Sequence, residues 1–257
     1  MKLLPQIIFL AVFFTLYGAI NYYIFRRSYQ AIPDAFSFKK IYPYLFIFFV
    51  SSFIIGRILE KVFMCAISDV LIFIGSFWFA VLLYAFLFLV LLDIIRLANH
   101  FFDFYPAFVK QQYTAIKLYI MIGFSIALTV LIIVGYNNAR NIITVRHTIT
   151  IRHKQTKLKS LKIALATDIH LGHIINGKEL SMLASMMNKE KPDLIVLAGD
   201  IVDEDLAPVI RYNLGEKLKA LKAPFGVYGV TGNHEYIGGA DDAVKYLNDH
   251  GVTMLLD

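Results

Sequence analysis

Two kinds of residue are scarce in this chain, and each scarcity excludes something. Cys65 is the only cysteine, so the chain cannot form an intrachain disulfide. Charged residues make up 17% of the 257 residues, whereas a soluble domain usually has about 25%. Hydrophobic residues reach 58%, against about 45–50% in a soluble domain. This composition is unusual for an entirely soluble chain, and part of this one is expected to lie in a bilayer.

Long apolar runs with almost no internal charge fill the first half. Four of them, at 5–25, 41–59, 70–92 and 116–136, approach the roughly 20 residues that a helix needs to cross a membrane. Unpaired backbone polar groups are costly in lipid, so these runs should be helical. A very apolar soluble helical domain is the alternative. Ionisable residues gather at the ends of the runs, which argues against a transporter or channel with a buried charged relay.

The charge distribution changes sharply after the fourth run. Residues 138–162 hold seven Lys and Arg and no acidic residue, whereas residues 163–257 hold 8 basic and 14 acidic residues. A basic segment beside a span favours anionic lipid headgroups, at about 1 kcal/mol per Lys or Arg. The last part of the chain is net acidic and has no aromatic-basic motif, so we expect no nucleic-acid partner. The lipid bilayer is the predicted partner, and the cell membrane the predicted location.

The flanks of the first run bear on orientation. Lys2 precedes this run and Arg26 and Arg27 follow it, which favours an external N-terminus under the positive-inside rule. An even number of spans would return the chain to the same side. The soluble part is thus predicted to be extracytoplasmic.

The pattern after residue 137 is that of an α/β domain. Residues 143–151 alternate β-branched and polar side chains, which predicts a first strand. Short apolar runs then predict buried strands near 161–167, 193–198, 226–231 and 252–256, with helices near 178–188, 207–221 and 240–250 between them. Such βαβα alternation implies a parallel sheet with right-handed crossovers. The predicted organisation is a four-helix transmembrane region at 1–137, a basic linker with the first strand at 138–160, and an α/β domain at 161–257.

Three polar loops follow three of the predicted buried strands. Asp168-Ile169-His170 ends the first, Gly199-Asp200 the second and Gly232-Asn233-His234 the third. The carboxyl ends of parallel strands share one edge of a sheet, where ligands bind. Two Asp, two His and one Asn suit hard divalent metals and phosphate chemistry. Each loop alone is a weak signal, because a lone D-x-H motif is more often a solvated loop, and Asp203 could support the site from outside the ligand set.

The order and the spacing of about 30 residues make the three loops more specific together. In this respect the chain resembles the calcineurin-like metallophosphoesterase family, and its apolar first half resembles the membrane-anchored branch. The matching segments are TDIHLG at 167–172, AGDIVD at 198–203 and TGNHE at 231–235. The resemblance implies a four-layer α/β sandwich, of which residues 161–257 would be the N-terminal half.

The resemblance also implies a site with two divalent metal ions, which could be Mn, Fe or Zn. By it, Asp168 and His170 bind the first metal, Asp200 bridges both, and Asn233 binds the second. His234 would be the catalytic residue beside the substrate phosphate. The implied reaction is hydrolysis of a phosphoester or pyrophosphate bond by a hydroxide that the two metals activate. Similar family members hydrolyse the pyrophosphate bond of nucleotide-linked acylated sugars or remodel lipid-linked phosphodiesters, so the resemblance implies a lipid-linked substrate, such as a molecule of the UDP-diacylglucosamine type.

One departure from the family pattern limits these expectations. The family's later motifs, an isolated His and a G-H-x-H loop, have no match here, and His173, the one remaining histidine near the loops, is expected to be a loop residue. We therefore expect the chain to be part of a longer protein, with weak metal binding and little activity by itself. The missing ligands also leave an alternative open, namely a non-catalytic membrane protein with a phosphoesterase-like binding module.

Overall fold

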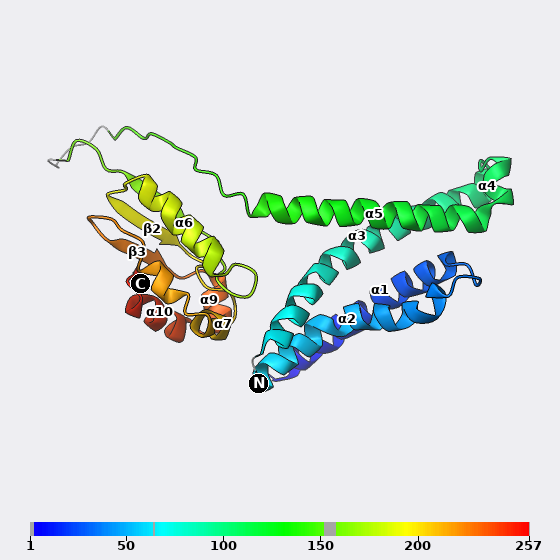
Figure 1. Cartoon of the computed structure of the whole chain (residues 1–257), viewed down its shortest axis with the longest axis horizontal. Helices are drawn as coiled ribbons and strands as arrows, with labels where there is room; N and C mark the ends of the chain where they lie inside the picture. Colours follow the sequence, from blue (N-terminus) through cyan, green and yellow to red (C-terminus); the bar gives the residue numbers. More distant parts are fainter. Residues whose placement is uncertain (1–2, 64, 152–157, 257) are drawn as a thin grey trace. The chain divides into compact units, whose positions relative to one another are not determined.

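Apolar helices make up the first of two units into which the chain divides, Met1–Asn138 and Ala139–Asp257 (Figure 1). The computed structural model describes residues 3–63, 65–151 and 158–256. The first unit contains α1 (Leu3–Ala31), α2 (Phe38–Val62), α3 (Ala66–Phe102), α4 (Ala107–Gln111) and α5 (Tyr113–Ala139). All four predicted apolar runs are therefore helical.

Three stretches within the described residues are long and apolar enough to cross a membrane, namely Ile7–Ala31, Ala66–Phe102 and Tyr113–Ala139. Helix α2 covers the run predicted at 41–59 but is not among them. Its uncharged stretch between Lys40 and Arg57 is only 16 residues long, short of the roughly 20 that a span needs. The structure thus supports three of the four predicted spans.

Helices α2 and α3 pack closely because glycines line their contact. A Cβ added to Gly75 of α3 would collide with the backbone of Phe53 in α2, and one added to Gly56 would lie 2.8 Å from the Ile72 side chain. The indole of Trp78 lies 5.2 Å from the ring of Phe46 and 5.7 Å from that of Phe49, centroid to centroid. Small residues therefore allow close approach, and aromatic side chains fill the space around it.

The second unit is a four-stranded parallel sheet with helices between its strands (Figure 1). The strands are β1 (Ile163–Ala166), β2 (Leu194–Ala198), β3 (Val227–Val230) and β4 (Thr253–Met254), in the order β1-β2-β3-β4. The helices are α6 (Gly177–Lys189), α7 (Leu206–Arg211), α8 (Gly215–Leu218), α9 (Asn233–Gly238) and α10 (Ala240–Asp249). The predicted parallel α/β architecture is confirmed.

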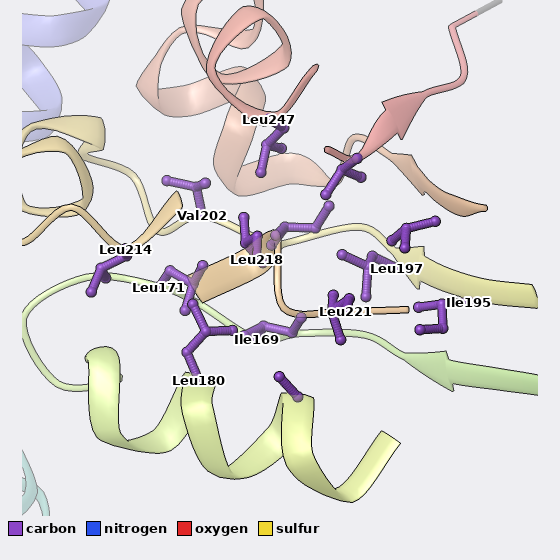
Figure 2. Packing of buried hydrophobic residues seen from close by; sticks show 14 of the residues in the cluster. Ile169, Leu171, Leu180, Ile195, Leu197, Val202, Leu214, Leu218, Leu221 and Leu247 are labelled. Atoms are coloured by element: carbon purple, nitrogen blue, oxygen red, sulfur yellow. The ribbon is translucent and has the colours of Figure 1, made fainter. Parts of the chain in front are cut away.

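The core of this unit lies on one face of the sheet. Ile195 and Leu197 of β2 are fully buried in a cluster with Leu180 of α6, Leu218 of α8 and Leu247 of α10 (Figure 2). Right-handed crossovers between strands that follow one another in sequence place every helix on the same face. On the opposite face, Ile163 and Leu165 of β1 are 52% and 65% exposed.

Two predicted elements are wrong. Residues 141–151 form no strand, and Ile143, Val145 and Ile149 are 62–84% exposed. A strand needs a neighbour for its N–H and C=O groups, and no ladder to this segment occurs within the described residues. The helix predicted at 207–221 is split into α7 and α8, because Asn213 between them adopts a left-handed conformation with φ of 50°.

Candidate metal centre

Backbone hydrogen bonds hold the first two loops side by side beyond the ends of β1 and β2. The N–H of His170 donates to the carbonyl of Asp200 at 2.9 Å, and the N–H of Leu171 to that of Ile201 at 2.9 Å. The N–H of Asp203 returns to the carbonyl of Leu171 at 3.0 Å. The pairing of β1 and β2 thus continues past the strands and fixes the first loop against the second.

Left-handed backbone conformations cluster in these loops. Asp168, His170 and Asp200 have φ of 54°, 51° and 49°, and Gly199 has φ of 85°. Such conformations cost on the order of 1–3 kcal/mol at a residue other than glycine, and they concentrate at functional sites. Three strained residues at adjacent strand ends therefore indicate a site in which the chain holds particular side chains in place.

The side chains of His170, Asp200 and His234 meet at this edge of the sheet. One potential ligand atom from each lies within 4.8 Å of the other two. The imidazoles of His170 and His234 meet edge to face, with centroids 4.4 Å apart. Asp200 is 8% exposed, and an Asp168 carboxylate oxygen lies 3.8 Å from Nε2 of His170. Carboxylate and imidazole donors at this spacing fit a divalent ion of the Mn, Fe or Zn type.

Asn233 directly precedes His234 in the sequence. It is the first residue of the short helix α9 and is exposed, whereas His234 beside it is half-buried. The sequence assigned Asn233 to a second metal and His234 to the substrate phosphate. Geometry brings His234 together with His170 and Asp200, and the individual roles of all five residues stay predictions.

Asp203 supports the site from the loop after β2. Its Oδ1 lies 3.0 Å from Nδ1 of His234 and 3.9 Å from Nδ1 of His170. When Nδ1 of His234 carries the proton, it donates to Asp203, and Nε2 becomes the free ring nitrogen. In the sequence, Asp203 follows directly after the Gly199-Asp200 loop that ends a buried strand, and this position is the signal for its contact with the site.

Glu235 is the residue whose place the sequence did not indicate. It is 1% exposed, and its carboxylate accepts hydrogen bonds from the backbone N–H groups of Asp200, Val202 and Gly232 at 3.2, 2.8 and 2.8 Å. From the sequence its role is unassigned, as either a surface carboxylate or one that supports the site from outside the ligand set. Gly232 caps a short helix, and Glu235 is the third residue after it. A glutamate at that position commonly accepts a hydrogen bond from the backbone N–H of the cap, so recognising the cap would have placed Glu235.

Comparison with known proteins connects this arrangement to one family. The family model described as calcineurin-like phosphoesterase matches residues 161–255. An uncharacterized metallophosphoesterase of Campylobacter jejuni is 27% identical over 248 residues, or 95% of this chain. A Helicobacter pylori protein of the same description is 34% identical over 97 residues. A bovine transmembrane protein with metallophosphoesterase domain is 38% identical over 111 residues.

The match to the Campylobacter protein includes both the helical half and the α/β half of the chain. The aligned part is 63% of the Campylobacter protein, 26% of the Helicobacter protein and 24% of the bovine protein. No solved structure matches the chain significantly. The bovine relative is thus named as a transmembrane protein with this domain, and each of the three relatives is longer than the region that matches.

Proposed function

We propose that this chain is a membrane-anchored, metal-dependent phosphoesterase, because the calcineurin-like phosphoesterase family model matches residues 161–255. The observation that carries the proposal is the convergence of His170, Asp200 and His234 within 4.8 Å beyond three parallel strand ends. Strained backbone at Asp168, His170 and Asp200 holds these side chains in place. The three candidate spans then anchor this domain at a membrane.

The donor set fits a pair of divalent ions. Asp168 and His170 would hold one, Asn233 would hold the other, and Asp200 would lie between them. Two such ions, when bound, supply Lewis-acid polarisation of phosphoryl oxygens and lower the pKa of bound water. The chain's own part is to present ligands of mixed charge on loops that hydrogen bonds already order. His170 would then be a ligand through one ring nitrogen, with Asp203 near the other.

His234 would act on the substrate phosphate. Asp203 accepts from Nδ1 in the tautomer that leaves Nε2 available, and the N–H of His234 donates to Oδ1 of Asp200 at 2.9 Å. The first contact limits rotation of the ring, and the second holds the backbone from which the ring projects. A fixed imidazole can stabilise the charge that develops on the phosphoryl oxygens, or protonate the leaving oxygen.

The substrate class that we propose is a phosphodiester or pyrophosphate bond of a lipid-linked molecule, such as a UDP-diacylglucosamine-type compound. A membrane anchor keeps the domain close to the surface where such a substrate lies, and the basic segment after α5 favours anionic headgroups. A soluble activated phosphodiester should still be hydrolysed, though more slowly, because the reacting group is the same.

The direct test is Mn²⁺-dependent hydrolysis of bis-p-nitrophenyl phosphate by the full-length protein in nanodiscs. We expect D200N to lose about 100-fold or more in kcat, and H234Q to lose kcat with little change in KM. D193N is the matched control, since Asp193 lies beside the opposite end of β2 and bonds the N–H of Lys162 at 2.8 Å. Equal rates in D200N and wild type would overturn the proposal. No Mn²⁺-dependent hydrolysis by wild type would favour a non-catalytic binding module.

A further inference from the structure

The middle loop of the site is held on its two sides by different means. Toward the first loop, Asp200 and Ile201 use their carbonyl groups, which accept from His170 and Leu171. Toward the third loop, the N–H groups of Asp200 and Val202 are the ones presented, and both donate to the carboxylate of Glu235. The second loop is therefore hydrogen-bonded to the first loop by backbone groups, and to the third loop by the side chain of Glu235.

The start of α9 explains why a side chain is needed there. Beyond β3 the chain turns into a helix at Asn233, so it cannot continue a strand ladder alongside the second loop. The two loops are nevertheless in close contact. A Cβ added to Gly232 would collide with the Asp200 carboxylate. Without an acceptor between them, the buried N–H groups of Asp200 and Val202 would lack partners, at a cost of about 1–3 kcal/mol each.

We propose that Glu235 is the positioning residue that sets the Gly199–Asp200 loop and the Gly232–His234 loop in the register needed to hold divalent metal. One carboxylate oxygen accepts from Asp200 and Gly232, and the other from Val202, so a single rigid group joins both loops. The described hydrogen bonds of this carboxylate all come from backbone N–H groups and not from the side chains predicted to bind metal. It acts through the backbone of Asp200, whose left-handed conformation it helps to hold.

A carboxylate suits this role better than an amide of the same shape. Three N–H donors converge on it, and an ionised carboxylate offers acceptors on both oxygens. A glutamine offers one carbonyl oxygen, and its NH₂ group would face at least one of the three N–H donors. The E235Q substitution should therefore keep the shape and loosen one of the two loops. Part of this inference rests on the proposed function, namely that the joined loops bind metal.

Glu179 offers a matched control elsewhere in the same unit. It is also buried, at 5% exposed, and it likewise lies three residues after the cap of its helix, where it accepts the N–H of Asn176 at 3.2 Å. Its described hydrogen bond and ion pair go to Asn176 and Arg140, and so serve the start of α6 and not the Asp200 or Gly232 loop. E179Q thus removes a buried carboxylate from a helix start without touching the Asp200 loop.

The test uses full-length protein in nanodiscs with two readouts. In metal-free protein, hydrogen exchange at the amides of Asp200, Val202 and Gly232 should be faster in E235Q than in wild type. Mn²⁺ affinity should fall about 10- to 100-fold, which is typical when a partner behind the metal ligands is removed. E179Q should change exchange only near the start of α6 and leave Mn²⁺ affinity within about threefold of wild type. If E235Q does not fold, E235D keeps the charge on a shorter arm and should show the same pattern.

Unchanged exchange at Asp200 and Val202 in E235Q, or Mn²⁺ affinity equal to that of E179Q, would overturn the inference. A different result would overturn the proposed function instead. If wild type binds no Mn²⁺ beyond what D200N binds, the metal site itself fails, while the exchange data still decide whether Glu235 joins the two loops.

Discussion

At the scale of single residues, Asp200 combines strain, burial and two kinds of contact. Its φ is 49°, its side chain accepts the N–H of His234 at 2.9 Å, and its own N–H donates to Glu235. Asp and Asn tolerate the left-handed region better than other residues with a Cβ. The residue type at this position is therefore restricted by backbone conformation as well as by any metal.

This gives different predictions for two substitutions of Asp200. D200N keeps the shape, the tolerance of positive φ and an oxygen acceptor, so we expect near-wild-type stability with Mn²⁺ binding lost. D200A places alanine in the left-handed region and removes the acceptor for His234, so we expect about 2 kcal/mol of destabilisation. Thermal unfolding and Mn²⁺ titration of both variants check this. Equal loss of stability in the two variants would contradict the role assigned to backbone conformation.

The sequence predicted the residues that end buried strands and missed those whose position depends on an unpredicted turn. Asp168, Asp200 and His234 could be placed because apolar runs of strand length precede their loops. Glu235 could not, because α9 has six residues and no apolar periodicity of its own. The strand expected at 143–151 had the right alternation, but alternation does not supply the neighbouring strand on which pairing depends.

At the scale of elements, the contact between α2 and α3 depends on glycine. Gly75 leaves no room for a side chain against Phe53, whereas a Cβ on Gly123 of α5 would meet no atom within 4 Å. Trp78, the only tryptophan, lies one turn from Gly75 and is 9% exposed against Phe46 and Phe49. Its fluorescence therefore reports on the packing of these two helices.

We expect G75L to separate α2 from α3 and to shift the Trp78 emission toward longer wavelength, with a lower midpoint of unfolding in SDS. Overpacking a tight contact typically costs about 1–3 kcal/mol. G123L adds the same bulk at an open position and should leave both measurements near wild type. Identical emission spectra for G75L and G123L would show that the glycine contact does not govern the packing of these helices.

At the scale of the whole molecule, the basic segment after α5 contacts the α/β unit as well as favouring lipid. Arg146 donates to both carboxylate oxygens of Glu190, at 3.1 and 2.5 Å, and Nζ of Lys162 lies 3.1 Å from one of them. Hydrogen bonds from Arg146 and then Lys162 lower the pKa of Glu190 from 4.5 to about 2. The segment predicted to bind headgroups is thus partly engaged by the end of α6.

A lowered pKa in the folded state means that the Glu190 contacts add stability above pH 4.5 and lose it as the pH falls toward 2. R146Q should raise the pKa of Glu190 toward its usual value, with Lys162 keeping part of the effect, and added salt should reduce the difference. Carbon-detected NMR titration of the carboxyl group measures this. As a control, K189Q removes a neighbouring exposed charge and is expected to leave the pKa of Glu190 close to its wild-type value. Equal Glu190 pKa values in R146Q and wild type would contradict the ion pair.

The side of the membrane on which the α/β unit lies is also a property of the whole chain. The predicted extracytoplasmic placement needs an even number of spans and so counts α2 as one, although three helices in the described part of the chain are long and apolar enough to cross a membrane. We expect an impermeant maleimide to label S185C in a C65S background in intact cells, since Ser185 is exposed on α6. Labelling only after permeabilisation would place the domain in the cytoplasm and match three spans.

The central claim is that three strand ends of this chain form a divalent-metal site. Its most direct test is Mn²⁺ titration of the full-length protein in nanodiscs, followed by electron paramagnetic resonance. Because part of the family's ligand set has no match in this chain, we predict weak Mn²⁺ binding in wild type, seen at high metal concentration. We predict loss of this binding in D200N, since Asp200 is the residue expected to lie between the ions. Binding that is absent in wild type, or the same in wild type and D200N, would contradict the account.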